Sequence, residues 1–350
     1  MFDSSENSQS LFNSGNELLE NGEYRLAMQK FLESAELGNS DAMNNLAWLS
    51  MEHGIRPTPP EPESGSHNSS IEEISHLLFQ DSYEIEWLER AAELGNVHAM
   101  LNRGKKYVPN LLEVAYQSLL RPTDEEIERL NLTGEITPLL HGPEYSIEDE
   151  LLGAAYWFRQ ACELNFEPAY GFLAEVSVYL GDLESHHFWM MRAIKSDLKS
   201  VGPVPGRTHS FWMSRYLEAL WNVDFEESRG QMSVAVIGQI FENLEEIDTM
   251  LQTNNLIFEY LKLARVYKNL SNQNGALYWY VKALEAYMDN EEFKWQCESL
   301  ADESFRYALS VGQTDLAKLL EQISKSIAEN NAARLRSRLV QNAKELAQGS

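Results

Sequence analysis

A short sequence pattern occurs twice in the chain. Residues 31–43 read FLESAELGNSDAM, and residues 87–100 read WLERAAELGNVHAM. In both segments, Ala-Glu-Leu-Gly-Asn is followed two residues later by Ala-Met. Glycine tolerates the left-handed conformation that often ends a helix, and asparagine is a favoured cap for the start of the next one. We therefore predict a helix end, a turn and a helix start here, and this pattern occurs once per repeat.

Related segments recur further along the chain. Three more copies lie at residues 156–170, 188–198 and 278–287, and the first of them has Asn165 in place of the glycine. The equivalent central residues of the five copies are Ala35, Ala92, Cys162, Ile194 and Leu284. These residues are 57, 70, 32 and 90 positions apart, and a separation of 32 is close to one helix-pair repeat. The larger separations predict insertions or degenerate units.

The composition of each copy also favours packed helices. Aromatic residues stand about one helical turn before small ones, as Trp157 stands before Ala161. Residues three and four apart share a helix face, so a large side chain beside a small one lets a neighbouring helix approach closely. Glycines that precede new helices are predicted to be turn residues between antiparallel helices; they are Gly22, Gly181, Gly275 and Gly312. No window shows sustained two-residue alternation, so we predict an all-α fold.

At this point the residues resemble a known family. An aromatic residue, then Ala-Ala-Glu-Leu-Gly-Asn, then Ala-Met, resembles a Sel1-like repeat, a relative of the tetratricopeptide (TPR) repeat. The resemblance is most specific at residues 24–48 and 83–106, whereas residues 260–287 and 305–323 look more like plain TPRs. It implies a right-handed superhelical solenoid of antiparallel helix pairs that serves as a protein-binding scaffold or adaptor. It implies no catalytic residues.

Composition shifts suggest a division of the chain. We predict a Sel1-like half over residues 1–200 and a TPR-like helical half over residues 201–330, separated at the Pro- and Gly-rich segment VGPVPGRT. Insertions at about 55–70 and 108–148 are expected to interrupt the first half, since the former is rich in Pro, Gly and Ser. Residues 331–350 are predicted to form a basic amphipathic helix.

That basic segment differs in charge from the rest of the chain. It carries Arg334, Arg336, Arg338 and Lys344, and its apolar residues follow one another at three or four positions. Such a helix could cap the end of a helical stack, because terminal repeats need a polar outer face. Docking to a partner, or to an acidic groove of the same or another copy, is the alternative.

The overall charge restricts the partners. The chain has 54 Asp plus Glu against 28 Lys plus Arg, a formal net charge of −26. Such a surface repels phosphate backbones and anionic lipid headgroups, so neither nucleic acid nor a membrane surface is expected as a partner. A basic protein or peptide would be attracted in a salt-dependent way. The alternative is that the acidity serves solubility alone.

The remaining bulk features favour a protein of the cytoplasm. The N-terminus has neither a basic nor an apolar signal-peptide region, and no apolar run approaches the length of a membrane span. Cys162 and Cys297 lie beside apolar residues at helical spacing. We expect them to be small buried side chains in a reducing compartment rather than a disulfide.

The sequence contains no recognisable catalytic motif. Neither a glycine-rich phosphate loop, nor a nucleophile elbow, nor a zinc-spaced cysteine pair is present. The segment DLESHHFW places Asp182, Glu184, His186 and His187 together. Adjacent histidines on a helix point about 100° apart, so we expect a solvated helix start there rather than a metal site. We therefore predict no enzyme activity, no cofactor and no bound metal.

Candidate binding residues are expected on the first helix of each repeat. In TPR-like superhelices these helices line the concave surface, which is where the resemblance places ligand contacts. The candidates are Asn44, Asn45, Asn102, Arg103, Lys106, Lys262, Arg265 and Asn269. Arginine forks and asparagine amides suit the carboxylates and backbone of a peptide. The alternative is that Arg103 and Lys106 only offset neighbouring acidic residues.

Taken together, these features favour a non-enzymatic scaffold or adaptor that holds a protein or peptide on the concave face of a solenoid. A peptide-responsive regulator, and an immunity or inhibitor protein for a basic toxin, are the alternatives. The partner and the oligomeric state do not follow from the sequence.

Overall fold

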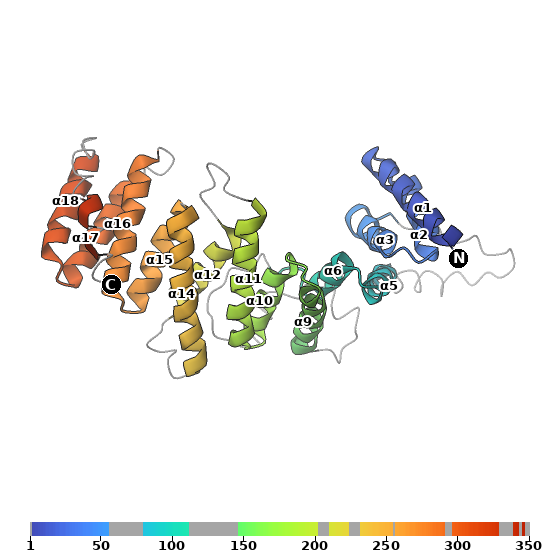
Figure 1. Ribbon diagram of the computed structural model, residues 1–350, viewed down its shortest axis with the longest axis horizontal. Coiled ribbons are helices and arrows are strands. Elements are labelled where there is room, and N and C mark those ends of the chain that lie inside the picture. The colour runs from blue at the N-terminus through green and yellow to red at the C-terminus, as the bar shows by residue number, and fades with distance from the viewer. Residues whose placement is uncertain are drawn as a thin grey trace, which may run out of the picture. The chain divides into compact units, whose positions relative to one another are not determined.

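The computed structural model is helical throughout the residues that it describes (Figure 1). These are residues 2–55, 80–111, 146–201, 210–223, 232–254, 256–290, 296–328, 339–342 and 345–346. No strand occurs within these ranges, which confirms the all-α prediction for them. None of the helices in this part of the chain is long and apolar enough to cross a membrane.

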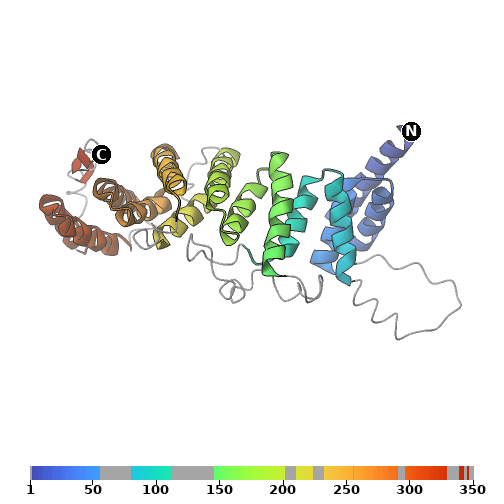
Figure 2. The ribbon, with the colours of Figure 1, turned by 90° about the horizontal axis from the view of Figure 1, so that it is seen from below.

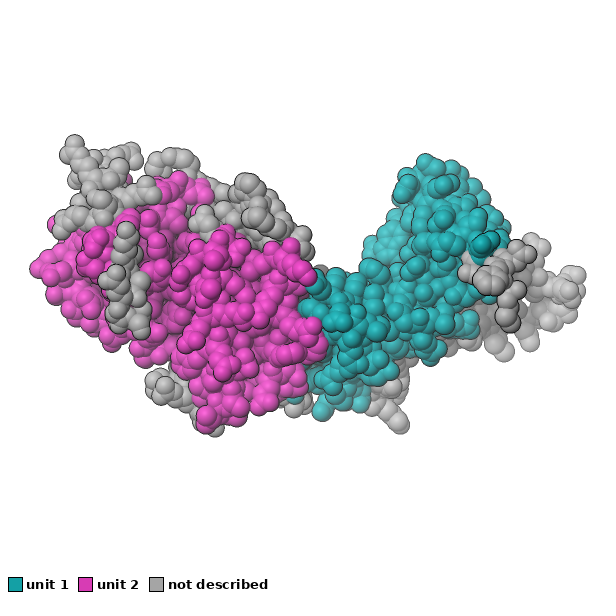
Figure 3. Space-filling view, in the orientation of Figure 1, with its two compact units in different colours: residues 1–114, 123–180 teal, residues 115–122, 181–350 magenta. Residues whose placement is uncertain are grey.

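The described residues form two compact units, shown in different colours in Figure 3. Unit 1 extends to Leu180 and unit 2 begins at Gly181, whereas the sequence predicted a division at residues 200 and 201. The difference arises from α11 (Leu183–Val201), which packs against the helices that follow it in unit 2. The predicted insertions lie almost wholly outside the described residues, and so does the VGPVPGRT segment.

Unit 1 is built from helices that pack against their neighbours in chain order (Figures 1 and 2). They are α1 (Phe2–Glu20), α2 (Tyr24–Glu36), α3 (Ser40–His53), α5 (Gln80–Glu93), α6 (Val97–Tyr107), α9 (Ile147–Glu163) and α10 (Ala169–Tyr179). Alternate helices also touch, because Asn45 on α3 donates to Asn16 on α1 over 3.3 Å. We call α1, α3, α6 and α10 the first-helix layer of unit 1, and α2, α5 and α9 its second-helix layer.

Unit 2 has the same two layers. It contains α11 and then α12 (Phe211–Asn222), α14 (Val234–Asn254), α15 (Ile257–Asn269), α16 (Gln273–Asp289), α17 (Cys297–Ser310) and α18 (Thr314–Ala328). Its first-helix layer is α12, α15 and α17, and its second-helix layer is α11, α14, α16 and α18. Within the layers, α12 packs on α15 and α11 on α14, and Trp279 on α16 donates to Asp248 on α14 over 2.5 Å.

The helix ends around Leu37, Leu94 and Leu164 are equivalent corners, as the repeated segment predicts. In each corner the following residue has a positive φ: 91° at Gly38, 85° at Gly95 and 58° at Asn165. The N–H of that residue donates three positions back, over 2.8, 2.8 and 2.9 Å respectively. The next N–H reaches five positions back in all three corners, which completes the same helix-ending motif.

Asparagine begins the next helix at two of these corners. The Asn39 side chain accepts from the N–H of Ala42, and the Asn96 side chain accepts from the N–H of Ala99, over 3.0 and 2.9 Å. Asn96 also donates to Asp41 over 2.7 Å, so the starts of α3 and α6 are tied together. The asparagine of the repeat therefore caps one helix and joins two successive repeats.

Turn glycines behave as predicted at three of four positions. Gly22, Gly181 and Gly312 have φ between 76° and 79°. The prediction for Gly275 was wrong, because this residue lies in the first turn of α16. Ser271 adopts the left-handed conformation instead, with φ of 59°, and Asn272 caps the helix by accepting from the N–H of Gly275.

Aromatic rings seated on glycines bring paired helices close together. A Cβ added to Gly104 on α6 would lie 2.4 Å from the ring of Phe158 on α9, and one added to Gly15 on α1 would lie 2.5 Å from Phe31 on α2. Both rings are fully buried. This pairing of a large side chain with a residue lacking one therefore joins α1 to α2 and α6 to α9.

The cysteines and the C-terminal segment can also be compared with their predictions. Neither Cys162 nor Cys297 forms a disulfide bond, and both are about 1% exposed, which confirms that they are buried. Residues 339–342 are helical and Leu339 is fully buried, while most of the predicted basic helix, including its arginines, lies outside the described residues.

The equivalence of the corners predicts equal responses to substitution. We expect Gly38→Ala and Gly95→Ala each to lower the free energy of unfolding by about 1 kcal/mol, because a Cβ strains the left-handed conformation. No atom lies within 4 Å of either new Cβ, so packing adds nothing to this cost. Asn165→Gly should stabilise by up to about 1 kcal/mol for the same reason. Urea denaturation checks all three, and clearly unequal glycine costs would contradict the equivalence.

Candidate functional site

All eight residues predicted to bind lie on first-helix layers. Asn44 and Asn45 are on α3; Asn102, Arg103 and Lys106 are on α6; Lys262, Arg265 and Asn269 are on α15. In unit 1 the asparagines meet one another across helices. Asn102 donates to Asn44 over 3.0 Å, and with the bond from Asn45 to Asn16 this forms a polar ladder across α1, α3 and α6. The half-buried side chains of this ladder join successive first helices.

Arg103 is held inside unit 1. Its side chain is only 3% exposed, and it donates to Glu89 over 3.0 Å and to the Tyr107 hydroxyl over 2.9 Å. The guanidinium also lies over the Tyr107 ring, 4.1 Å from its centroid. These contacts join α6 to α5, and they agree with the alternative that Arg103 offsets a neighbouring acidic residue.

Lys106 is paired in a similar way. Its ammonium donates to Glu84 on α5 over 2.8 Å, and the other oxygen of Glu84 accepts from the Ser50 hydroxyl on α3 over 2.8 Å. Glu84 is buried and Lys106 is half-buried. Lys106 therefore neutralises a buried carboxylate that also fixes α3, so this cation has a structural partner in the same unit.

In unit 2 the predicted residues of α15 reach both neighbouring first helices. Lys262 donates to the Ser214 hydroxyl and to Glu218, both on α12. Asn269 donates to the backbone carbonyl of Trp221, at the end of the same helix. These bonds join α15 to α12 at two points along their contact.

Arg265 pairs with the other neighbouring first helix, α17. Its guanidinium makes two bonds to Glu303 on α17, over 3.0 and 2.8 Å, and stacks 4.4 Å from the Trp221 ring centroid. The Tyr280 hydroxyl donates to the same carboxylate over 2.7 Å. Burial alone would raise the pKa of Glu303, but the bonds from Arg265 and Tyr280 outweigh burial and lower this pKa.

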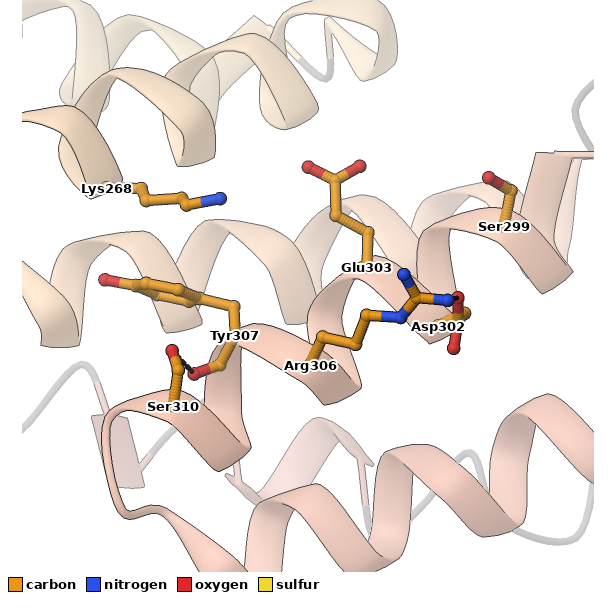
Figure 4. A pocket seen from close by; sticks show the side chains of 7 residues that line it. All are labelled: Lys268, Ser299, Asp302, Glu303, Arg306, Tyr307 and Ser310. Carbon is orange, nitrogen blue, oxygen red and sulfur yellow. Dashed lines mark hydrogen bonds and ion pairs between the residues drawn. The ribbon is translucent and has the colours of Figure 1, made fainter.

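An open cleft of about 370 Å³ lies between α15 and α17, directly beside this cluster (Figure 4). It is lined by Lys268, Ser299, Asp302, Glu303, Arg306, Tyr307 and Ser310. The Lys268 ammonium lies 5.5 Å from the centroid of the Tyr307 ring. Among the described residues Lys268 makes no ion pair, whereas Arg306 is paired with Asp302 over 2.7 Å. An unpaired ammonium above an aromatic ring can receive a carbonyl or carboxylate oxygen.

Two buried polar centres were not found from the sequence. The first is Glu150 on α9, which is 3% exposed and has no hydrogen-bond partner among the described residues on either carboxylate oxygen. Burial, opposed by the nearby Arg103 and assisted by Asp149, raises the pKa of Glu150 to about 7. A signal was present, because Glu150 shares a helix face with Ala154 and Phe158, which are both fully buried.

The second centre corrects the prediction for the DLESHHFW segment. Asp182 and Glu184 are solvated, and Asp182 accepts from the N–H of Ser185 over 3.0 Å at the helix start. His186 and His187, however, are fully buried, so the prediction of a solvated helix start was wrong for them. The spacing from His186 to Met190, another fully buried residue, was the missed signal. No metal-holding group of three or more His, Cys, Asp or Glu occurs among the described side chains.

The chain matches no model of a known protein family, and no curated protein matches it either. What it does must therefore be argued from its own geometry. The features that bear on function are the paired polar residues of the first-helix layers, the cleft of unit 2, and the two buried centres.

Proposed function

We propose that this chain is a non-enzymatic scaffold of the Sel1 and TPR type, a right-handed superhelical solenoid that holds a protein or peptide segment on its first-helix layers. The equivalent corners and the two-layer packing support the repeat architecture. The cleft between α15 and α17 is the proposed contact site, and it is the observation that carries the proposal.

The chemistry of the cleft suits an extended polypeptide. Tyr307 gives an aromatic platform, and the Lys268 ammonium above it can donate to a backbone carbonyl or an acidic side chain. Asp302 and Glu303 also line the cleft, and their carboxylates can accept from N–H groups or basic side chains. A segment with groups of both kinds would be satisfied in this site, and the net charge of −26 adds attraction for a basic partner.

Filling the cleft should weaken peptide binding. Ser299 is exposed at its edge, so Ser299→Trp adds bulk there without disturbing a buried side chain. Peptides selected from a displayed random-sequence library on the full chain provide the probe. We expect Ser299→Trp and Lys268→Ala to weaken these peptides about tenfold or more, measured by calorimetry or fluorescence anisotropy, which corresponds to about 1.4 kcal/mol.

Matched variants on the second-helix layer serve as controls. Thr249→Trp on α14 and Lys318→Ala on α18 alter an exposed hydroxyl residue and an exposed lysine away from the cleft. These variants should bind the peptides as the wild type does. Equal affinities for all four variants, or a selection that yields no binding peptide, would contradict the proposed function.

A further inference from the structure

Three helices of unit 2 meet at a buried polar network outside the cleft. His187 on α11 and Tyr216 on α12 are fully buried, and Asn243 on α14 is 3% exposed. The His187 Nδ1 atom lies 2.9 Å from the Tyr216 hydroxyl oxygen. Asn243 donates to the same oxygen over 3.0 Å and to the His187 carbonyl over 3.4 Å. The network therefore ties α12 to both α11 and α14.

The hydrogen-bond directions require a neutral imidazole. Because Asn243 donates to the Tyr216 oxygen, the phenol proton is available for His187 Nδ1. Nδ1 is then an acceptor, and the ring proton lies on Nε2, which has no hydrogen-bond partner in the described part of the chain. A second ring proton would turn Nδ1 into a donor, and the Tyr216 hydroxyl proton would lose its acceptor. It would also place a charge in a site that water does not reach.

We infer that this network is an acid-sensitive latch: protonation of His187 breaks its bond to Tyr216 and releases α12 from α11 and α14. Burial, and then the neighbouring His186, lower the pKa of His187 well below 6.5. In acid, His187 of the unfolded or opened chain therefore binds a proton, whereas His187 in the closed network stays neutral. As the pH falls below about 6.5, the closed form loses stability relative to the open one.

The groups around His187 do not oppose this effect. His186 on α11 and Tyr216 on α12 are the titratable groups that face it, and neither supplies a negative charge near neutral pH, because burial raises the pKa of Tyr216 far above its usual value. The carboxylates of α14 lie elsewhere: Glu242 and Glu245 are exposed, Glu246 pairs with Lys195 over 2.8 Å, and Asp248 accepts from Trp279 on α16 over 2.5 Å. None of these carboxylates of α14 is therefore placed to stabilise an imidazolium.

Opening of the latch would loosen the first-helix layer of unit 2 through α12. Besides Tyr216, this helix carries Ser214 and Glu218, which hold Lys262, and Trp221, which contacts Arg265 and Asn269. Release of α12 removes these supports from α15. Acid would then weaken ligand binding at the cleft, a consequence that rests on the proposed function, whereas the latch itself does not.

Hydrogen exchange on the full chain tests the latch without any ligand. After correction for intrinsic rates, the opening constants of the α12 amides should rise by up to tenfold per pH unit below about 6.5. His187→Gln keeps an acceptor for the Tyr216 hydroxyl but cannot take up the proton. This variant should lose the acid dependence in α12 while remaining protected at neutral pH.

A second histidine provides the matched control. His98 is exposed in unit 1, so His98→Gln should leave the pH dependence of α12 unchanged. If His187→Gln does not fold, the imidazole state of the wild type can be followed by NMR instead. The latch would be overturned by an unchanged acid dependence in His187→Gln, or by a protonated His187 at pH 6 in a protein whose α12 amides stay protected.

Discussion

Replacing Arg103 with methionine is expected to lower the free energy of unfolding by about 3 kcal/mol, because a buried cation with fixed partners is lost. Arg103 is 3% exposed and joins Glu89 to Tyr107. Its removal leaves the Tyr107 hydroxyl without that donor and leaves the buried Glu150 without the positive charge that opposes its pKa shift. Urea denaturation measures the total cost, and hydrogen exchange in α6 and α9 locates it.

A second arginine offers a direct comparison. Arg90 on α5 also has a carboxylate partner, Glu86, and also lies over an aromatic ring, that of Trp87. Its side chain is 54% exposed, so Arg90→Met should cost less than about 1 kcal/mol. Similar costs for the two substitutions would show that burial of Arg103 does not matter.

Relative to the wild type, the Glu150→Gln variant is expected to become more stable as the pH rises. The folded-state pKa of Glu150 is raised from 4.5 to about 7, so the folded chain holds a proton in this window that the unfolded chain has lost. The wild type therefore loses stability as the pH rises from 4 to 8, by about 3 kcal/mol from this group. Glu150→Gln cannot ionise, and its stability relative to the wild type should grow by that amount over the same range.

A neighbouring glutamate controls for charge alone. Glu148 lies in the same first turn of α9 but is exposed, so Glu148→Gln should change stability by a few tenths of a kcal/mol at either pH. Denaturation curves at pH 4 and pH 8 for the three proteins are sufficient. If Glu150→Gln showed no gain at pH 8 over pH 4, the carboxyl would not be buried and unpartnered as described.

The two buried centres respond to acid in opposite directions. Protonation removes the buried charge of Glu150, so acidification from neutral pH favours unit 1 at this group. Protonation disrupts the His187 network, so the same acidification disfavours unit 2. Wild-type hydrogen exchange at several pH values therefore provides an internal comparison, in which α9 gains protection relative to α12 as the pH falls.

Local structure was predictable where a single residue type decides the backbone. Glycine at positions 38 and 95 marks the left-handed corner, and Asn165 substitutes for it because asparagine tolerates the same conformation. The turn prediction for Gly275 was wrong because an Asn-Gly pair also suits the first turn of a helix, here one capped by Asn272. Only the hydrogen bonds distinguish the two cases.

The partners of the predicted binding residues could not be found from the sequence. Arg265 and Glu303 are 38 positions apart, and Asn44 and Asn102 are 58 apart, so their pairing depends on which helices become neighbours. Helical spacing places Glu150 and His186 on buried faces, although charged and polar side chains are usually exposed. An acidic residue or histidine on an otherwise apolar stripe is therefore evidence for a buried polar centre.

The most direct test of the scaffold proposal is a hydrogen-exchange footprint of a selected peptide on the full chain. If the first-helix layer of unit 2 binds the peptide, amides of α15 and α17 around Lys268 and Tyr307 gain protection, while α18 is unchanged. Protection confined to α14, α16 and α18, with α15 and α17 unaffected, would contradict the account.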